Sequence, residues 1–163
     1  MLEVESLTTR YGSISALRDV GLSVGAGEVV CLIGPNGAGK TTLLSTISGL
    51  LNPVSGSIRL ENEEITSWSP DRILRSGLAL VPEHRRIFGD LTVDENLLVG
   101  GVTVASARRL ELKEEVISLF PVLGEKLATE AGYLSGGEAQ QLAIGRALTV
   151  SYTHLTLPTI LLV

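Results

Sequence analysis

The sequence has one cysteine, few basic clusters and no long apolar run, and each scarcity excludes a class of protein. Cys31 has no partner for an intrachain disulfide, so a reducing compartment is expected. Lysine and arginine number 13 against 18 acids, and the net charge is −5. With Arg85-Arg86 and Arg108-Arg109 as the basic pairs, nucleic acid is not an expected partner. No apolar stretch approaches the ~18 to 20 residues that a membrane helix needs.

The start of the chain also lacks the pattern of a secretory signal. Glu3 and Glu5 interrupt it, and no basic residue precedes an apolar run. A length of 163 residues predicts one domain with a true core. We therefore expect a cytoplasmic protein in which any link to a membrane comes through a partner. Cys31, inside an apolar run, is expected to be a core residue rather than a reactive thiol.

That apolar run, Val29–Ile33, opens the most informative stretch of the chain. It predicts a strand buried on both faces of a parallel sheet. The next residues fit G-x-x-x-x-G-K-[ST], and Thr42–Leu51 predicts a helix. Strand, glycine loop and helix in this order are typical of a phosphate-binding P-loop. The expected phosphate-binding residues are Gly34, Pro35, Asn36, Gly37, Ala38, Gly39, Lys40, Thr41 and Thr42.

Each residue type in the loop has a physical reason to be there. Glycines let backbone N–H groups turn toward a phosphate, and the helix start adds partial positive charge. Lys40 would contact the β- and γ-phosphates, and the Thr41 hydroxyl would ligate Mg²⁺. A chance glycine-rich turn is the alternative in a chain with 18 glycines, but the flanking elements argue against it. The sequence predicts that the chain binds a nucleoside triphosphate.

The rest of the chain divides into an α/β half, residues 1–90, and a helical half, residues 91–148. In the first half we expect two antiparallel strands joined at Tyr11-Gly12, a short helix beginning near Pro70, and a buried strand over Leu78–Val81. In the second, two capping boxes, T-x-x-E from Thr92 and S-x-x-E from Ser135, predict helix starts. Apolar spacing predicts a further helix over residues 105–120.

The stretch LSGGEAQ, from Leu134 to Gln140, resembles the signature sequence of ABC-type ATPases, and the resemblance runs from Met1 to about Leu148. LVPEHRRIFGDLTVDENL, from Leu80 to Leu97, is similar to the ATP-binding subunits of branched-chain amino acid importers. The resemblance implies an ABC-type P-loop ATPase fold. Such a fold has a parallel-sheet core, N-terminal antiparallel strands and an α-helical subdomain, and here it is expected to be incomplete at the C-terminus.

The resemblance also implies roles for single residues. Tyr11 matches the aromatic residue that stacks on adenine, although it also suits a plain turn. Glu83 stands where most of the family has a glutamine that contacts Mg²⁺ and faces the transmembrane permease subunits. A carboxylate still ligates a hard cation, and the alternative is a solvated acid beside Arg85 and Arg86. ATP and Mg²⁺ are thus the implied cofactors.

The signature residues Ser135, Gly136, Gly137 and Glu138 would contact the ATP held by a second ATP-binding subunit. S-x-x-E alone is only a helix cap, but a plain cap has no need of consecutive glycines. The resemblance therefore implies a homo- or heterodimer, attached through permease subunits to the inner face of the cell membrane.

Three catalytic groups of the family have no counterpart here: the Walker B aspartate, the catalytic glutamate and the switch histidine. No aspartate follows Asp94 and no glutamate follows Glu138, and His154 lies too early for the switch role. Residues 149–163 change composition abruptly, having neither charge nor glycine from Ser151 onward, and are expected to be a non-native tail. The alternative is that residues 158–163 begin the Walker B strand.

Three functions remain open from the sequence. The first is the ATP-hydrolysing subunit that powers import of branched-chain amino acids or a related solute. The second is a soluble ABC ATPase without membrane partners, and the third, for these 163 residues taken literally, is nucleotide binding without hydrolysis. A GTPase is excluded because no N-K-x-D motif occurs.

Overall fold

The structure is a computed structural model of the chain and describes residues 1–81, 87–102, 104–149 and, by backbone alone, 154–156. These residues form two compact units, an N-terminal unit of Met1–Ile73 and a C-terminal unit of Leu74–Leu157. The chain passes between them within α2 (Pro70–Arg75), the short helix predicted from the proline. The division of roles at residue 90 and the non-native character of residues 149–163 stay predictions.

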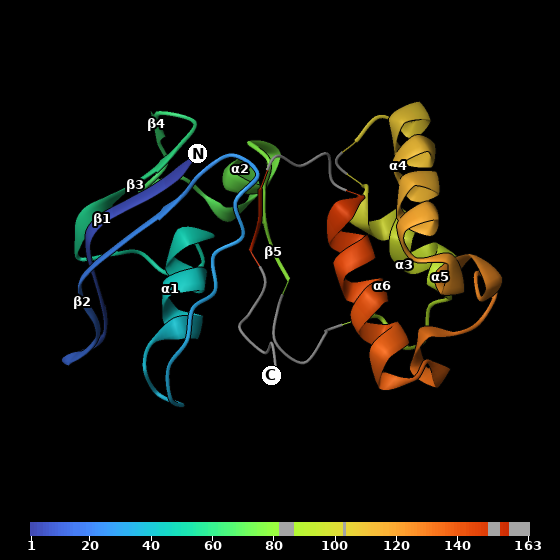
Figure 1. Cartoon of the computed structure of the whole chain (residues 1–163), viewed down its shortest axis with the longest axis horizontal. Helices are drawn as coiled ribbons and strands as arrows, with labels where there is room; N and C mark the ends of the chain where they lie inside the picture. Colours follow the sequence, from blue (N-terminus) through green and yellow to red (C-terminus); the bar gives the residue numbers. More distant parts are fainter. Residues whose placement is uncertain (82–86, 103, 150–153, 157–163) are drawn as a thin grey trace. The chain divides into compact units, whose positions relative to one another are not determined.

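The N-terminal unit is built on an antiparallel sheet with the strand order β2-β1-β3-β4 (Figure 1). The predicted hairpin is confirmed: Tyr11 pairs with Ile14, and Gly12 adopts the left-handed conformation that favours glycine in the turn. Alternation along the first strand buries Leu2 and Val4. The strands are β1 (Leu2–Tyr11), β2 (Ile14–Val24), β3 (Ser55–Leu60) and β4 (Glu63–Glu64).

Helix α1 (Lys40–Ile47) lies against this sheet (Figure 1). Its side chain Ile47 is fully buried, and a buried pair of hydroxyls joins Thr46 to Thr9 on β1 at 3.2 Å. The Thr46 hydroxyl donates to the Thr42 carbonyl at 2.7 Å, so the Thr9 hydroxyl is the donor in the pair. The C-terminal end of α1 is thus fixed on the sheet.

The prediction of a buried strand over Val29–Ile33, the segment before α1, is wrong, because this segment forms no strand. Val29 is 87% exposed and Ile33 is 94% exposed, and Cys31, expected in the core, is exposed as well. A strand buried on both faces requires hydrogen-bonded neighbours. Neither sheet in the described part of the chain includes this segment. The apolar run indicates a tendency toward burial but cannot specify the strands that would pair with it.

The C-terminal unit combines a short parallel strand pair with a group of helices (Figure 1). The predicted strand is confirmed as β5 (Leu78–Leu80), paired with β6 (His154–Thr156). Both capping boxes and the helix predicted over 105–120 are also confirmed. The helices are α3 (Val93–Gly100), α4 (Ser106–Leu119), α5 (Pro121–Glu125), the 3-10 turn η1 (Ala131–Tyr133) and α6 (Gly136–Leu148). Within the described residues, no helix has both the length and the apolarity needed to cross a membrane.

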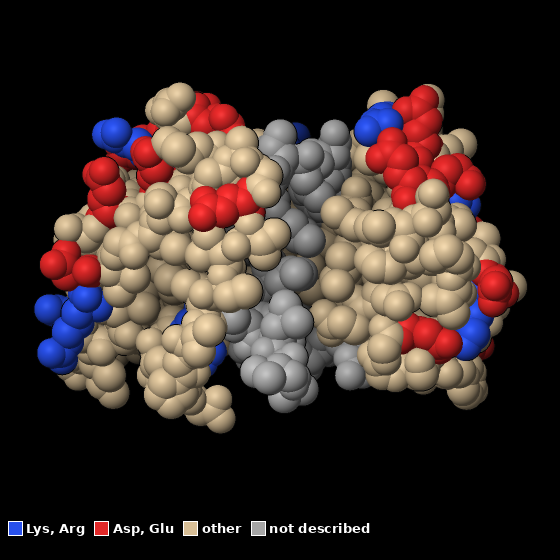
Figure 2. Space-filling model, viewed as in Figure 1, with Lys and Arg blue, Asp and Glu red and all other residues tan. Residues whose placement is uncertain are grey.

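The solvent-facing side of α4 is charged, and Figure 2 shows its acidic side chains gathered over the helix. Arg108 forms ion pairs with Glu111 and Glu115, both at 3.0 Å, and these exposed pairs contribute little to stability. Lys113 reaches across to Asp94 on α3 at 2.8 Å and is only 16% exposed. The Lys113–Asp94 pair therefore joins two helices of the unit.

The helices of the C-terminal unit close on a shared apolar core, and α6 lies tightly against α3 and α4 at Gly145. A β carbon at Gly145 would lie 2.7 Å from Val116 Cγ1 and 3.3 Å from Leu97 Cδ2, closer than real contacts allow. Glycine is thus required there by packing. The buried core residues are Val93, Leu97, Val116, Leu123, Ala131 and Leu142.

We expect Gly145→Ala to lower the free energy of unfolding by about 1 to 2 kcal/mol, because overpacking costs more than the gain in helix propensity. The matched control is Gly137→Ala in the same helix, where a β carbon would meet nothing within 4 Å. The control should be neutral or slightly stabilising. Guanidinium unfolding of both variants measures the difference, and equal stabilities would contradict the tight packing at Gly145.

Candidate nucleotide-binding site

The glycine loop from Gly34 to Thr41 is shaped by two left-handed residues at its end. Gly37 has φ +84° and Gly39 has φ +89°, conformations that favour glycine. Ala38, which lies between these two glycines, donates its N–H to the Pro35 carbonyl at 3.2 Å. The chain turns sharply here and enters α1 directly from Gly39. The loop that the sequence predicts to bind phosphate is thus followed by a helix, but no strand precedes it.

Gly39 is also the point of closest approach between the loop and the sheet. A β carbon there would lie 2.8 Å from Leu17 Cδ2 and 2.9 Å from the Ala16 carbonyl oxygen of β2. Gly39 is the N-cap residue of α1, and no side chain caps the helix start. Backbone N–H groups in the first turn of a helix lack intrahelical acceptors, so this helix start suits an anion. The residues present therefore fit a phosphate group.

Lys40 folds its side chain back over the loop. Its Nζ donates to the Gly34 carbonyl at 2.8 Å and to the Pro35 carbonyl at 3.0 Å. These are neutral acceptors, and a phosphate oxygen is a stronger acceptor for an ammonium group. The positive charge is thus placed at the mouth of the loop by bonds that an anion can replace.

The other predicted loop residues differ in exposure. Asn36, Ala38 and Thr41 are exposed, so the Thr41 hydroxyl is at the surface of the unit, whereas Thr42 is buried against the sheet. No group of three or more histidine, cysteine, aspartate or glutamate side chains gathers in the described ranges. Glu83, the second predicted Mg²⁺ ligand, lies outside the described residues.

Tyr11 stands at the tip of the β1–β2 hairpin and is 51% exposed. Its pairing partner Ile14 is exposed too. Two residues further along β2, the Ala16 carbonyl lies against Gly39 of the loop. The hairpin that carries Tyr11 therefore also forms the wall against which the loop rests. The exposed Tyr11 ring is therefore carried by the same hairpin that contacts the glycine loop.

The signature residues form the start of α6 in the C-terminal unit. The Ser135 hydroxyl accepts from the Glu138 N–H at 3.4 Å, and the Glu138 carboxylate accepts from the Ser135 N–H at 2.9 Å. Gly136 and Gly137 are exposed, and a β carbon at Gly137 would meet nothing within 4 Å. Packing within the chain therefore does not explain glycine at position 137, in contrast to position 145.

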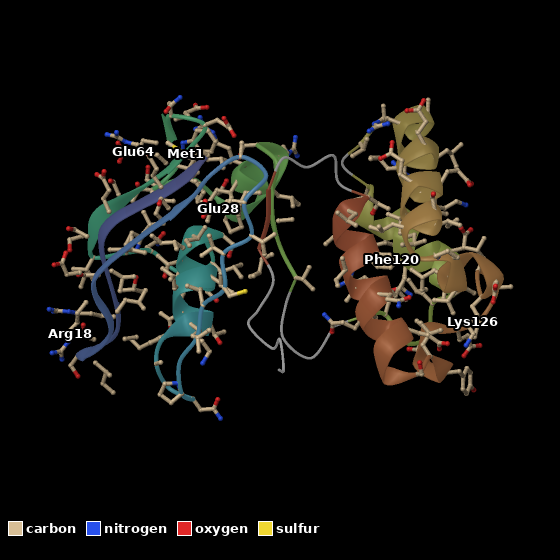
Figure 3. All side chains as sticks on the ribbon, in the orientation of Figure 1. Met1, Arg18, Glu28, Glu64, Phe120 and Lys126 are labelled. Atoms are coloured by element: carbon tan, nitrogen blue, oxygen red, sulfur yellow. The ribbon has the colours of Figure 1, made fainter. Side chains whose placement is uncertain are left out.

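Lys126 supports this helix start and was not identified from the sequence. Its Nζ lies 2.7 Å from the Glu138 carboxylate, and Figure 3 shows it beside the start of α6. The pKa of Glu138 is lowered, first by Lys126 and then by the Ser135 N–H. The carboxylate of the capping box thus stays ionised well below neutral pH. No sequence signal links a lysine twelve residues before Glu138 to the site.

Comparison with known proteins agrees with this geometry. Residues 17–157 match the family model described as ABC transporter. The chain is 49% identical over 148 residues to the high-affinity branched-chain amino acid transport ATP-binding protein BraG of Pseudomonas aeruginosa, covering 91% of this chain and 64% of that protein. It is 36% identical over 148 residues to the probable branched-chain amino acid transport ATP-binding protein LivF of Archaeoglobus fulgidus, covering 91% and 63%. The chain therefore spans just under two thirds of the length of these relatives.

Solved structures show the same fold. A nucleotide-free ATP-binding cassette from an ABC transporter matches with TM-score 0.86 and 29% identity, over 96% of this chain and 68% of that chain. The ADP conformation of an ATP-binding cassette of an ABC transporter matches with TM-score 0.84 and 29% identity, over 95% of this chain and 66% of that chain. A dimeric bacterial ABC transporter cassette matches with TM-score 0.83 and 25% identity, over 96% and 73%. The predicted fold class is confirmed, and the chain belongs to the ABC transporter family of ATP-binding domains.

Proposed function

We propose that the chain binds Mg·ATP as part of an ATP-binding subunit that powers import of branched-chain amino acids or a related solute. The observation that carries the proposal is the glycine loop at the start of α1, with the Lys40 ammonium held at its mouth. The relatives named for branched-chain amino acid transport support the substrate class, the first at 49% identity. Import itself would require contact between the ATP-binding subunit and the permease subunits.

In this proposal the phosphates lie on the backbone of residues 34–39, and Lys40 exchanges its carbonyl acceptors for β- and γ-phosphate oxygens. Thr41 and Glu83 would hold Mg²⁺, which neutralises phosphate charge when bound. Tyr11 would stack on adenine, since an aromatic face accepts a base without a hydrogen-bond code. Thr42 continues the helix start whose N–H groups face the anion.

The second half of the proposal concerns a partner chain. Ser135, Gly136 and Gly137 would bind the γ-phosphate of a nucleotide held in the partner's loop, with Glu138 keeping the helix start in shape. A related cassette whose structure is described as dimeric supports this assembly. Because the loop and the signature of one chain would serve different nucleotides, the dimer is head-to-tail and its two sites are equivalent. Permease subunits would dock near Glu83 and place the protein at the inner face of the membrane.

The first test is Lys40→Ala. Loss of the ammonium should weaken binding of a fluorescent ATP analogue by about ten- to a hundredfold, because a charge-assisted contact is worth ~1.5 to 3 kcal/mol. Lys113→Ala is the matched control, since it removes a lysine from the C-terminal unit and leaves the loop intact. Equal affinities of Lys40→Ala and the unchanged chain would show that the loop is not the nucleotide site.

The second test concerns Tyr11. Tyr11→Ala should weaken binding of the same analogue by about five- to a hundredfold, because stacking on a base is worth ~1 to 3 kcal/mol. Tyr11→Phe keeps the ring and should bind like the unchanged chain. If both substitutions weaken binding equally, the phenol hydroxyl rather than the ring is the contact, and the stacking role is wrong.

We also infer that a polypeptide of these 163 residues binds ATP without turnover at a rate typical of the family. No aspartate follows Asp94 in it and no glutamate follows Glu138, so the signature helix is not followed by a carboxylate to orient the attacking water. Phosphate release should therefore stay at the level of a protein-free control. Release that disappears in Lys40→Ala would overturn the inference, because it would come from this site.

A further inference from the structure

Asn96, a residue of α3 without an assigned role, forms four side-chain hydrogen bonds. It is fully buried, with 0% exposure. Its Nδ2 donates to the carbonyls of Phe88 at 2.9 Å, Leu91 at 3.3 Å and Thr92 at 2.9 Å, and its Oδ1 accepts from the Phe88 N–H at 2.9 Å. The side chain thus binds both backbone groups of one residue and two further carbonyls of the same short segment.

The orientation of this amide follows from its surroundings. Three carbonyl oxygens surround one end, where two of them share one hydrogen of Nδ2, and an N–H faces the other end, so the reverse placement of Nδ2 and Oδ1 would satisfy none of the four groups. An apolar side chain of the same size would leave the Phe88 N–H without its acceptor in a partly buried place, which is costly. Asparagine at position 96 therefore specifies the path of residues 88–92.

The backbone of residues 88–92 is hydrogen-bonded to η1, the 3-10 turn that precedes the signature. The Gly132 N–H donates to the Gly89 carbonyl at 2.9 Å, and the Ala131 N–H donates to the Leu91 carbonyl at 2.8 Å. Thr92 also forms a strand-like bridge with Glu130. The backbone of η1 is therefore bonded at successive points to the segment that Asn96 holds.

The turn continues without a break into the start of α6. The Leu134 N–H donates to the Ala131 carbonyl at 3.2 Å, and the next residue, Ser135, is the N-cap of the helix. The Arg146 guanidinium of α6 lies over the Phe88 ring, 5.0 Å from its centroid. The held segment thus contacts the signature helix at two separated places, through η1 before the N-cap and through the side chain of Phe88.

We propose that Asn96 is a positioning residue for the signature. By fixing residues 88–92 it sets the place of η1, and through η1 the direction in which Ser135, Gly136 and Gly137 face a nucleotide on a partner chain. The inference rests on the proposed function, because it assumes that the signature binds the partner's nucleotide. Asn96 itself touches no nucleotide in this account.

The test uses the 163-residue chain with Mg·ATP and the variants Asn96→Leu, Val116→Ala and Ser135→Ala. Asn96→Leu should weaken ATP-dependent dimerisation by about tenfold, measured by analytical ultracentrifugation, and leave binding of a fluorescent ATP analogue unchanged. Hydrogen exchange at the Ala131 and Gly132 amides should become about tenfold faster. Val116→Ala, a substitution on α4 in the same apolar core that removes no hydrogen bond to residues 88–92, controls for lost stability and should dimerise normally once its unfolding is accounted for.

Gly132→Ala tests the same link from the other side, and decides the matter if Asn96→Leu does not fold. A β carbon at Gly132 would lie 3.3 Å from the Gly89 carbonyl oxygen, so it should push the turn away and weaken dimerisation. Normal dimerisation in a folded Asn96→Leu, or in Gly132→Ala if the former is unfolded, would overturn the positioning role. Normal dimerisation in Ser135→Ala would instead overturn the proposed function, and the exchange rates would still report on the link from Asn96 to η1.

Discussion

The account depends on one constraint, that the first turn of a helix leaves backbone N–H groups without acceptors inside the helix. The chain begins α1 at Gly39 without a side-chain cap and begins α6 at Ser135 with two exposed glycines. A side chain at Gly39 would collide with β2, whereas a β carbon at Gly137 would meet nothing within 4 Å. Both helix starts are thus open to an anion, and the rest of each unit holds its helix start in place.

The two helix starts are stabilised in different ways. At the start of α1 the support is steric, because Gly39 fits against Ala16 and Leu17 of β2. At α6 it is polar, because the capping box is reinforced by Lys126 and preceded by a turn bonded to the segment that Asn96 holds. A steric support tolerates little change in size, whereas a polar one depends on each donor having its acceptor.

Local signals explain what could be predicted from the sequence. The glycine loop, both capping boxes, the first hairpin and the helix over 105–120 depend on residues close together in the chain, and all are seen in the structure. Pairing between distant segments is not encoded locally, so the apolar run Val29–Ile33 gave a strand prediction that was wrong. Asn96 and Lys126 were missed because no motif or periodic pattern links either residue to its partners, which lie 4 to 12 residues away.

The central claim is that a loop from one chain and a signature from another make one nucleotide site. The direct measurement mixes Lys40→Ala with Ser135→Arg and follows dimerisation by analytical ultracentrifugation with Mg·ATP. Neither variant alone can form a complete site. The mixed dimer has one complete site, formed by the loop of the Ser135→Arg chain and the signature of the Lys40→Ala chain. We expect dimers in the mixture alone, with one nucleotide bound per dimer. A mixture that stays monomeric while the unchanged chain dimerises would contradict the account.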